Sequence, residues 1–135
     1  MQDRAAGRQK LVTLMQTIAD FQAVYDHQTL DFGDKSPVCM VFSDGTMDGP
    51  SVTAAGSDDT HAYAIEYWWT RDLNTASATE ASMDALTSQI RALLKRNRGA
   101  NGVWQHAKID GFSQPDNVIL DSKQFRRERI RVVAW

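Results

Sequence analysis

The segment from residue 124 to residue 135, QFRRERIRVVAW, constrains the fold most, because its side chains alternate between two unlike sets. The apolar set, which shares its face with Glu128, consists of Ile130, Val132 and Ala134. The cationic set consists of Arg127, Arg129 and Arg131, followed on the same face by Val133 and Trp135. Alternation with a period of two residues is typical of a β-strand. The segment therefore predicts a strand with one face in the core and a second face rich in guanidinium groups.

A second alternating segment, residues 61–69 (HAYAIEYWW), predicts another strand. The set that suits a core face is Tyr63, Ile65, Tyr67 and Trp69. The set that faces the other way is Ala62, Ala64, Glu66 and Trp68. If the two strands are neighbours, Glu66 can pair across the sheet with an arginine.

Two segments show the spacing of amphipathic helices. In residues 4–27 the apolar stripe consists of Leu11, Leu14, Met15, Ile18, Phe21 and Tyr25. In residues 74–102 the stripe consists of Met83, Leu86, Ile90, Leu93 and Leu94. Each stripe covers one side only, so each helix is expected to pack on a sheet.

Shorter apolar runs predict the remaining strands at residues 38–42 and 103–109, with a further short strand at 118–120. Long loops are expected near 43–60 and 111–123, where Gly, Ser and Asp are frequent. The order lacks a regular β-α-β alternation, which favours an α+β fold. We expect a single domain over residues 1–135, with a mostly antiparallel sheet of about four to five strands and two helices packed on one face.

Composition and motifs argue against several functional classes. The formal charge of −2 and the pI of about 5.8 do not favour a general nucleic-acid binder. Cys39 is the only cysteine, and it lies in an apolar run typical of a buried thiol. No apolar run has the length of a membrane span, and no segment resembles a signal peptide, so we expect a protein made in the cytoplasm. The three histidines match no metal or catalytic spacing, so we expect no enzyme activity, no cofactor and no metal.

The sheet face opposite the helices is expected to be open, and arginine and tryptophan are enriched at the centres of interfaces. The residues expected to contact another subunit or partner are Glu66, Trp68, Arg127, Arg129, Arg131 and Trp135. Two alternatives are a solvated face and, less favoured by the acidic chain, a platform for single-stranded nucleic acid. This assignment predicts that Arg129→Glu leaves the fold nearly intact, whereas Ile130→Asp unfolds the subunit.

The order of these segments, with SPVCMVF and HAYAIEYWW before the second helix and RRERIRVVAW at the end, resembles the tail terminator (tail completion) proteins of long-tailed phages and phage-like particles. The resemblance spans nearly the whole chain and contains no diagnostic motif. It implies an α+β subunit of a homo-hexameric ring that caps the tail tube. The implied partners are the tail tube protein and the head-completion or stopper protein, with DNA only passing through the bore and no membrane contact. It also implies a location in the tail–neck region of a virion assembled in the host cytoplasm, with no catalytic residues.

Two other classes remain compatible with the sequence. One is a different neck or head-completion component of such a particle. The other is a small stand-alone ligand-binding α+β domain, which would have an apolar pocket near Tyr63, Trp68 and His106.

Overall fold

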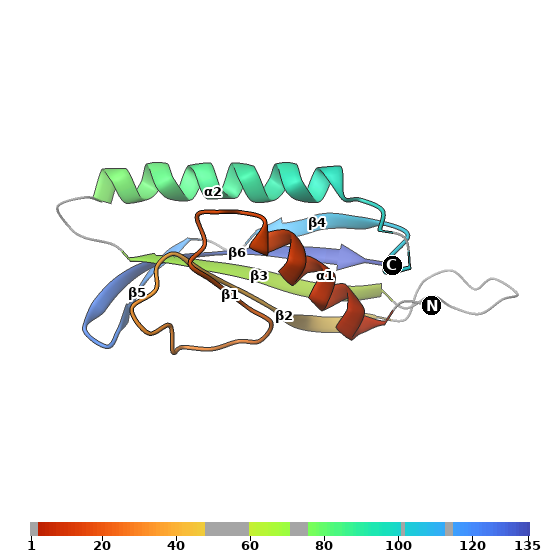
Figure 1. The fold of residues 1–135 in the computed structure, drawn as a ribbon, viewed down its shortest axis with the longest axis horizontal. Coiled ribbons are helices and arrows are strands. Elements are labelled where there is room, and N and C mark those ends of the chain that lie inside the picture. The colour runs from red at the N-terminus through yellow and green to blue at the C-terminus, as the bar shows by residue number, and fades with distance from the viewer. Residues whose placement is uncertain (1–2, 48–59, 71–75, 101, 113–114) are drawn as a thin grey trace, which may run out of the picture.

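The computed structural model describes residues 3–47, 60–70, 76–100, 102–112 and 115–135. Its elements in chain order are α1 (Arg4–Gln16), β1 (Ala23–Tyr25), β2 (Val38–Met47), β3 (Thr60–Thr70), α2 (Ala76–Arg96), β4 (Ala107–Phe112), β5 (Asp116–Leu120) and β6 (Lys123–Ala134). The described strands form one sheet, and the long helix α2 runs along it (Figure 1).

The sheet has six strands in the order β1-β2-β3-β6-β4, and β5 also pairs with β6. Only β1 and β2 run parallel, and every other pairing is antiparallel. One edge of β6 pairs with β3, while β5 and β4 share its other edge. The fold is therefore α+β with a mostly antiparallel sheet, as the sequence predicts. The sheet has six strands, one more than the largest number expected.

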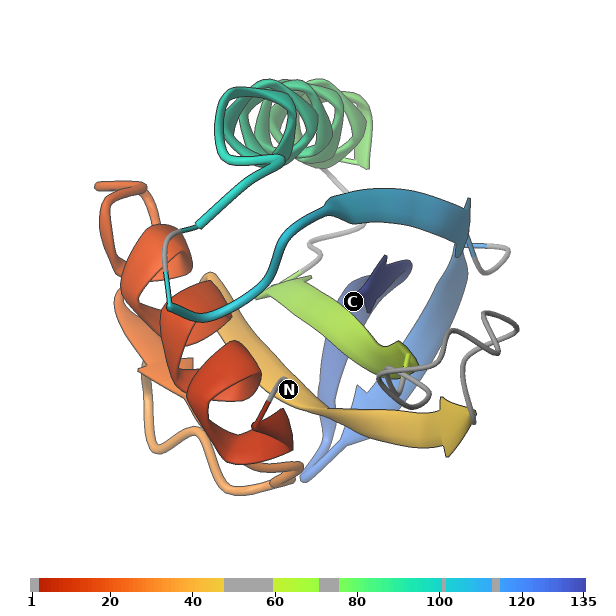
Figure 2. The same ribbon diagram turned by 90° about the vertical axis from the view of Figure 1, so that its right-hand side faces the viewer.

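Both helices pack on the same face of this sheet, which confirms the predicted face assignment of β3 and β6. The core between helices and sheet contains Leu11 and Met15 of α1, and Met83 and Leu86 of α2. The strands contribute Tyr63, Ile65, Tyr67, Ile130, Val132 and Ala134. α1 lies beside β2 and α2 lies above β4 (Figure 2), so the two helices cover neighbouring parts of one curved face. Cys39 is buried in this core, as expected for a lone apolar thiol.

The first helix is shorter than the predicted span of 4–27. α1 ends at Gln16, although Ile18 and Phe21 continue the apolar stripe into the core. The chain then enters β1, where Val24 pairs with Cys39 of β2. The helical spacing of the apolar residues is therefore satisfied by a turn and a short strand. β-branched Val24 and aromatic Tyr25 favour that strand, and the edge of β2 supplies their backbone partners.

Two strands and both loops differ from the predicted boundaries. β4 covers 107–112 rather than 103–109, and Trp104 of the preceding turn is buried in the core. β2 continues to Met47 through a register shift between Ser43 and Thr46, so the first part of the predicted 43–60 loop is strand. Residues 48–59 of that predicted loop lie outside the described part of the chain. The predicted 111–123 loop contains the end of β4 and all of β5.

A tight turn at Asp121 and Ser122, both with positive φ, joins β5 to β6. The predicted short strand at 118–120 is therefore part of a hairpin that begins at Asp116. Neither of the two described helices combines the length and the hydrophobicity that a bilayer crossing requires.

Candidate subunit interface

The candidate site is the arginine ladder, which we define as Arg127, Arg129 and Arg131 together with the carboxylates that hold them. The register of β3 and β6 places Arg129 opposite Glu66 and Arg127 opposite Trp68. The cross-strand pairing of Glu66 with an arginine, predicted from the sequence, is confirmed.

Glu66 is the buried centre of the ladder. Arg129 donates from Nε and Nη2 to Oε2 of Glu66, at 2.9 Å and 2.6 Å. The indole Nε1 of Trp68 donates to Oε1 of the same carboxylate at 2.8 Å. Both carboxylate oxygens therefore have partners, as burial of a charged group requires. The Arg129 guanidinium also lies 5.3 Å from the ring centre of Phe42, which adds a cation–π contact.

Arg127 holds a second carboxylate, which comes from β5. Its Nε donates to Oδ1 of Asp116 at 2.9 Å, and its Nη2 donates to Oδ2. These hydrogen bonds lower the pKa of the Asp116 carboxyl below its usual range, and they raise the pKa of Arg127. The Arg127 guanidinium lies 5.2 Å from the ring centre of Trp68. The bidentate geometry fixes the plane of the guanidinium group.

Arg131 connects two further strands. Its Nε donates to Asp44 of β2 at 3.3 Å, and its Nη1 donates to Asp110 of β4. Ala64 lies between Arg131 and Phe42 in the sheet register, and its small side chain leaves space above β3 for both. The ladder therefore ties β2, β4 and β5 to the central pair of strands.

The face that carries the ladder is not open, which corrects the prediction. A second apolar cluster covers one end of it and consists of Phe32, Val38, Met40, Trp68 and Phe125. Phe32 comes from the connection between β1 and β2, and it contacts the rings of both Trp68 and Phe125. Glu66 and Trp68 are each only 1% exposed, so neither side chain can reach a partner directly. Instead, Glu66 holds Arg129 and Trp68 contacts Arg127 from the buried side of the ladder.

The three arginines retain a partly exposed surface. Their side chains are 33%, 35% and 35% exposed for Arg127, Arg129 and Arg131 respectively. They are thus the members of the predicted set that a partner can contact. Each is already paired within the chain, so the ladder presents a nearly neutral surface rather than a cationic one.

Trp135 lies apart from the ladder, beside β4. Its backbone N–H donates to His106 at 2.9 Å, and its carbonyl accepts from Gln105 and His106. Its ring packs against His106 at 4.9 Å, with the Lys108 ammonium 5.8 Å from the ring centre. These contacts hold the end of β6 in place, but they do not bring Trp135 to the three arginines.

The alternating pattern of the strands does not predict the aspartates that hold the ladder. Asp44, Asp110 and Asp116 belong to segments that were predicted as loops or partly as loops, and Phe32 belongs to a connection that showed no pattern. Their spacing in the sequence carries no signal, because they meet the arginines only through the pairing of strands distant in the chain.

The described residues contain no cluster of His, Cys, Asp or Glu that could hold a metal ion. Tyr63 and Trp68 lie in separate apolar clusters on opposite faces of the sheet, so they do not line a common pocket with His106. The ladder has no nucleophile beside a base. Its chemistry is that of a rigid array of hydrogen-bond donors and acceptors.

No protein-family model matches the sequence, and no curated protein matches it at a significant level.

Proposed function

We propose that this protein is a structural virion protein that acts as a tail terminator, forming a homo-hexameric ring that caps the tail tube of a phage or phage-like particle. The observation that carries the proposal is the arginine ladder on the sheet face away from the helices. Its guanidinium groups are held in fixed planes and are partly exposed, which is the form in which arginine contributes most to an interface. The α+β fold and the order of its elements are consistent with the resemblance noted from the sequence.

A closed ring requires a heterologous interface, in which two different patches of the same subunit meet. The ladder would supply one patch. Its internal pairing lowers the entropy lost on association, because the side chains are ordered before the neighbour arrives. Its nearly neutral charge also fits a protein contact better than a contact with nucleic acid, which favours unpaired cations.

In this role the protein has no catalytic activity and no cofactor. Its partners are further copies of itself, the tail tube protein and a head-completion or stopper protein, and DNA passes through the bore. Its location is the tail–neck region of the virion.

The decisive experiment has two parts. Native mass spectrometry of the purified protein, with and without tail tubes, is expected to show a closed ring, and electron microscopy is expected to show one ring between tube and neck. A protein that stays monomeric at high concentration in the presence of tubes contradicts the proposal. A ring found elsewhere in the particle would assign the protein to another neck component.

The ladder itself is tested with Arg131→Gln, because both carboxylate partners of Arg131 are at the surface. The variant is expected to fold and to weaken ring formation about tenfold, which is typical for an interface arginine. Arg96→Gln is the matched control, since Arg96 is exposed on α2 and distant from the ladder. Equal effects of the two variants would exclude the ladder from the ring contact.

A further inference from the structure

Three cations for which the described part of the chain supplies no acidic partner lie on a different surface from the ladder. Among the described residues, every arginine from 126 to 131 forms an ion pair with a carboxylate. Arg91, Lys95 and Arg98 form none within the same described part of the chain. They are spaced at i, i+4 and i+7, which places them on one side of the last turns of α2 and the residues just after it.

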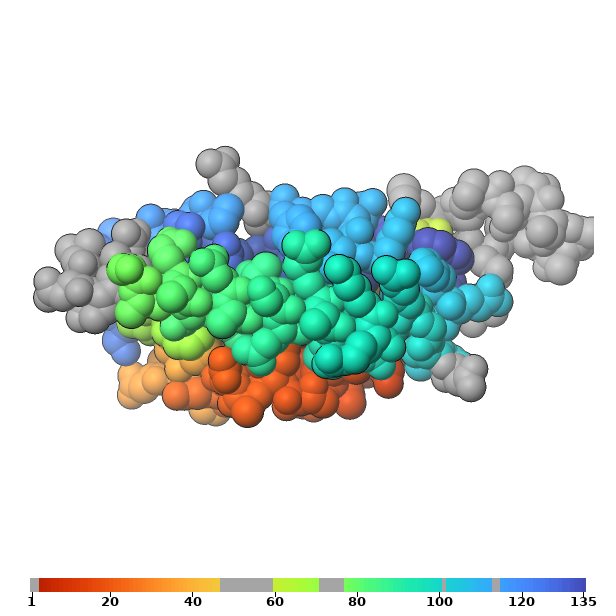
Figure 3. Space-filling model, turned by 90° about the horizontal axis from the view of Figure 1, so that it is seen from above, coloured from red at the N-terminus to blue at the C-terminus, as the bar shows by residue number. Residues whose placement is uncertain are grey.

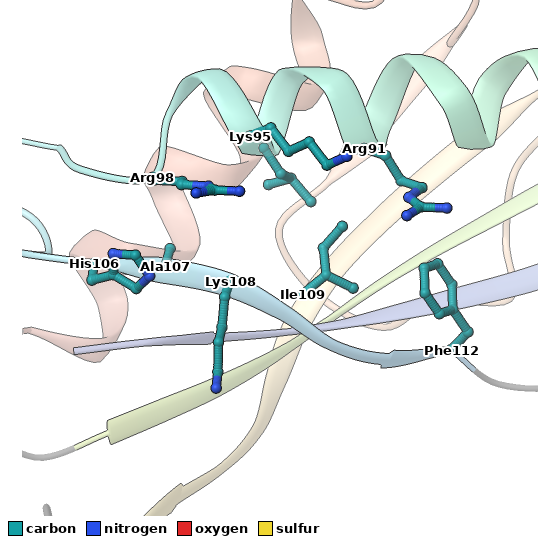
Figure 4. Close-up of a pocket in the computed structure, with 9 residues that line it drawn as sticks. Arg91, Lys95, Arg98, His106, Ala107, Lys108, Ile109 and Phe112 are labelled. Atoms are coloured by element: carbon teal, nitrogen blue, oxygen red, sulfur yellow. The ribbon is translucent and has the colours of Figure 1, made fainter.

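These three cations line a groove between α2 and β4. The groove has a volume of about 460 Å³, and its floor includes Ala107 and Ile109 of β4. Figure 4 shows Arg91, Lys95 and Arg98 extending over the strand, whereas Lys108 points away from the helix. Seen from above, α2 runs between the N-terminal residues and β4 (Figure 3). The side of the helix that carries the three cations is therefore the side that meets β4.

Phe112 gives one end of the groove an exposed aromatic surface. A register shift between Ile109 and Gly111 reverses the alternation of β4, which puts Phe112 on the same face as Ile109. The Arg91 guanidinium lies 5.5 Å from the ring centre of Phe112, yet the residue is 54% exposed. An exposed aromatic ring beside unpaired cations is suited to a ligand with both apolar and anionic groups.

Among the residues that the structure describes, no carboxylate lines the groove, although the chain as a whole carries a net charge of −2. The cations therefore repel one another and attract an anionic partner, whose binding would relieve the repulsion. The apolar floor of the groove favours a polypeptide over nucleic acid, whose backbone would leave that floor without a partner.

β4 also offers a backbone edge, because it is the last strand of the described sheet. The N–H of Ala107 already donates to the carbonyl of Arg98 at 2.7 Å, so the edge available for pairing begins beyond Ala107. An exposed strand edge is a site at which an extended segment adds by backbone hydrogen bonds.

We propose that the groove between α2 and β4 binds an extended acidic segment of a partner polypeptide, which adds as a strand beside β4. Its carboxylates contact Arg91, Lys95 and Arg98, and an apolar side chain packs on Phe112. This inference is independent of the ring proposed above, because it uses none of the ladder residues.

The test uses the full chain and a fluorescent peptide of about eight residues, the length of an ordinary strand, in which glutamate and valine alternate. Fluorescence anisotropy at low salt is expected to show saturable binding that weakens as salt is added. Two further peptides carry N-methyl groups, one on the glutamate nitrogens and one on the valine nitrogens. Only one set of nitrogens faces a partner strand, so one methylated peptide is expected to bind and the other is not.

The variant Lys95→Glu/Arg98→Glu is expected to lower the affinity at least about tenfold, since it reverses two charges at the contact. Lys10→Glu/Arg96→Glu is the matched control, because it makes the same change in net charge at one partly exposed and one exposed position, neither of which lines the groove. Circular dichroism checks that both variants fold.

Three results would overturn the proposal. One is the absence of saturable peptide binding to the wild-type protein, and another is an equal loss of binding in the two double variants. The third is that an oligothymidylate of equal length binds more tightly than the peptide and that Lys95→Glu/Arg98→Glu abolishes this binding. That result would assign the groove to nucleic acid. None of these results bears on ring formation, and a failure to form rings leaves the peptide result unchanged.

Discussion

Arg129 and Glu66 face each other across β6 and β3, and the arginine donates two hydrogen bonds to one buried carboxylate oxygen. The other oxygen accepts from Trp68. The pair therefore links a partly exposed cation to a residue of the sheet interior. This relationship changes what substitutions of the arginine are expected to do.

Arg129→Glu is expected to destabilise the fold by about 3 kcal/mol, because it removes the partner of a buried charge and adds a second carboxylate beside it. This expectation reverses the prediction made from the sequence, which treated Arg129 as a surface residue. The control is Glu66→Gln/Arg129→Met, which removes both charges and retains an acceptor for Trp68, and it is expected to be much closer to wild type. Urea denaturation measures both. Wild-type stability of Arg129→Glu would show that the pair contributes little.

Ile130 and Ile119 form a matched pair for testing the faces of the sheet. Ile130 is fully buried under the helices, whereas Ile119 of β5 is 72% exposed. Ile130→Asp is expected to lose about 4 kcal/mol or more, since it buries an unpaired charge. Ile119→Asp is expected to change stability by less than about 0.5 kcal/mol. Circular dichroism during thermal unfolding separates the two, and similar losses would contradict the assigned faces.

Phe32 is expected to hold the connection between β1 and β2 against the second apolar cluster. It is 4% exposed and contacts Trp68 and Phe125, whereas Leu30 in the same connection is 58% exposed. Phe32→Ala is therefore expected to lose about 3 kcal/mol, and Leu30→Ala is expected to remain near wild type. Chemical denaturation gives both values. If Phe32→Ala were neutral, the cluster would contribute nothing to the stability of this face.

The Asp116–Arg127 pair predicts a specific dependence of stability on pH. The hydrogen bonds from Arg127 lower the pKa of Asp116 in the folded state relative to the unfolded chain. The pair therefore stabilises the fold at pH values above the pKa of Asp116 in the unfolded chain, which is about 4. This contribution is lost as the pH falls through the lower pKa of the folded state.

Asp116→Asn is accordingly expected to be less stable than wild type at neutral pH, and the difference is expected to shrink as the solution becomes acidic. Urea titrations of both proteins over this pH range measure the difference. Asn117→Asp is the companion variant for this comparison. It places a carboxylate at the next position of the same strand, which pairs in register with Arg126 rather than with Arg127. A difference that is constant with pH would show that the Asp116 carboxylate is not the group responsible.

The alternating segments were the most informative part of the sequence. They predicted β3 and β6, the faces of both strands and the cross-strand pairing of Glu66, because a strand assigns successive side chains to opposite faces by local geometry alone. The helical stripes likewise predicted that α1 and α2 cover one sheet face. The predicted end of α1 was wrong, since the apolar residues at 18 and 21 can reach the same core from a turn.

The carboxylates of the ladder and the covering of its face were not predictable in the same way. Asp44, Asp110 and Asp116 reach the arginines from three different strands, and Phe32 covers Trp68 from a connection without regular structure. The groove between α2 and β4 likewise exists only because the helix and the strand are packed together.

The sequence by itself determined which side chains of each long strand and helix share a face, because backbone geometry imposes a period of two or 3.6 residues on any chain. Only the tertiary structure decided which cations are paired with carboxylates of the same chain and which remain available to a partner. That distinction depends on distances between groups far apart in the chain, and the Coulomb and hydrogen-bond energies that act over those distances have no local trace in the order of the residues.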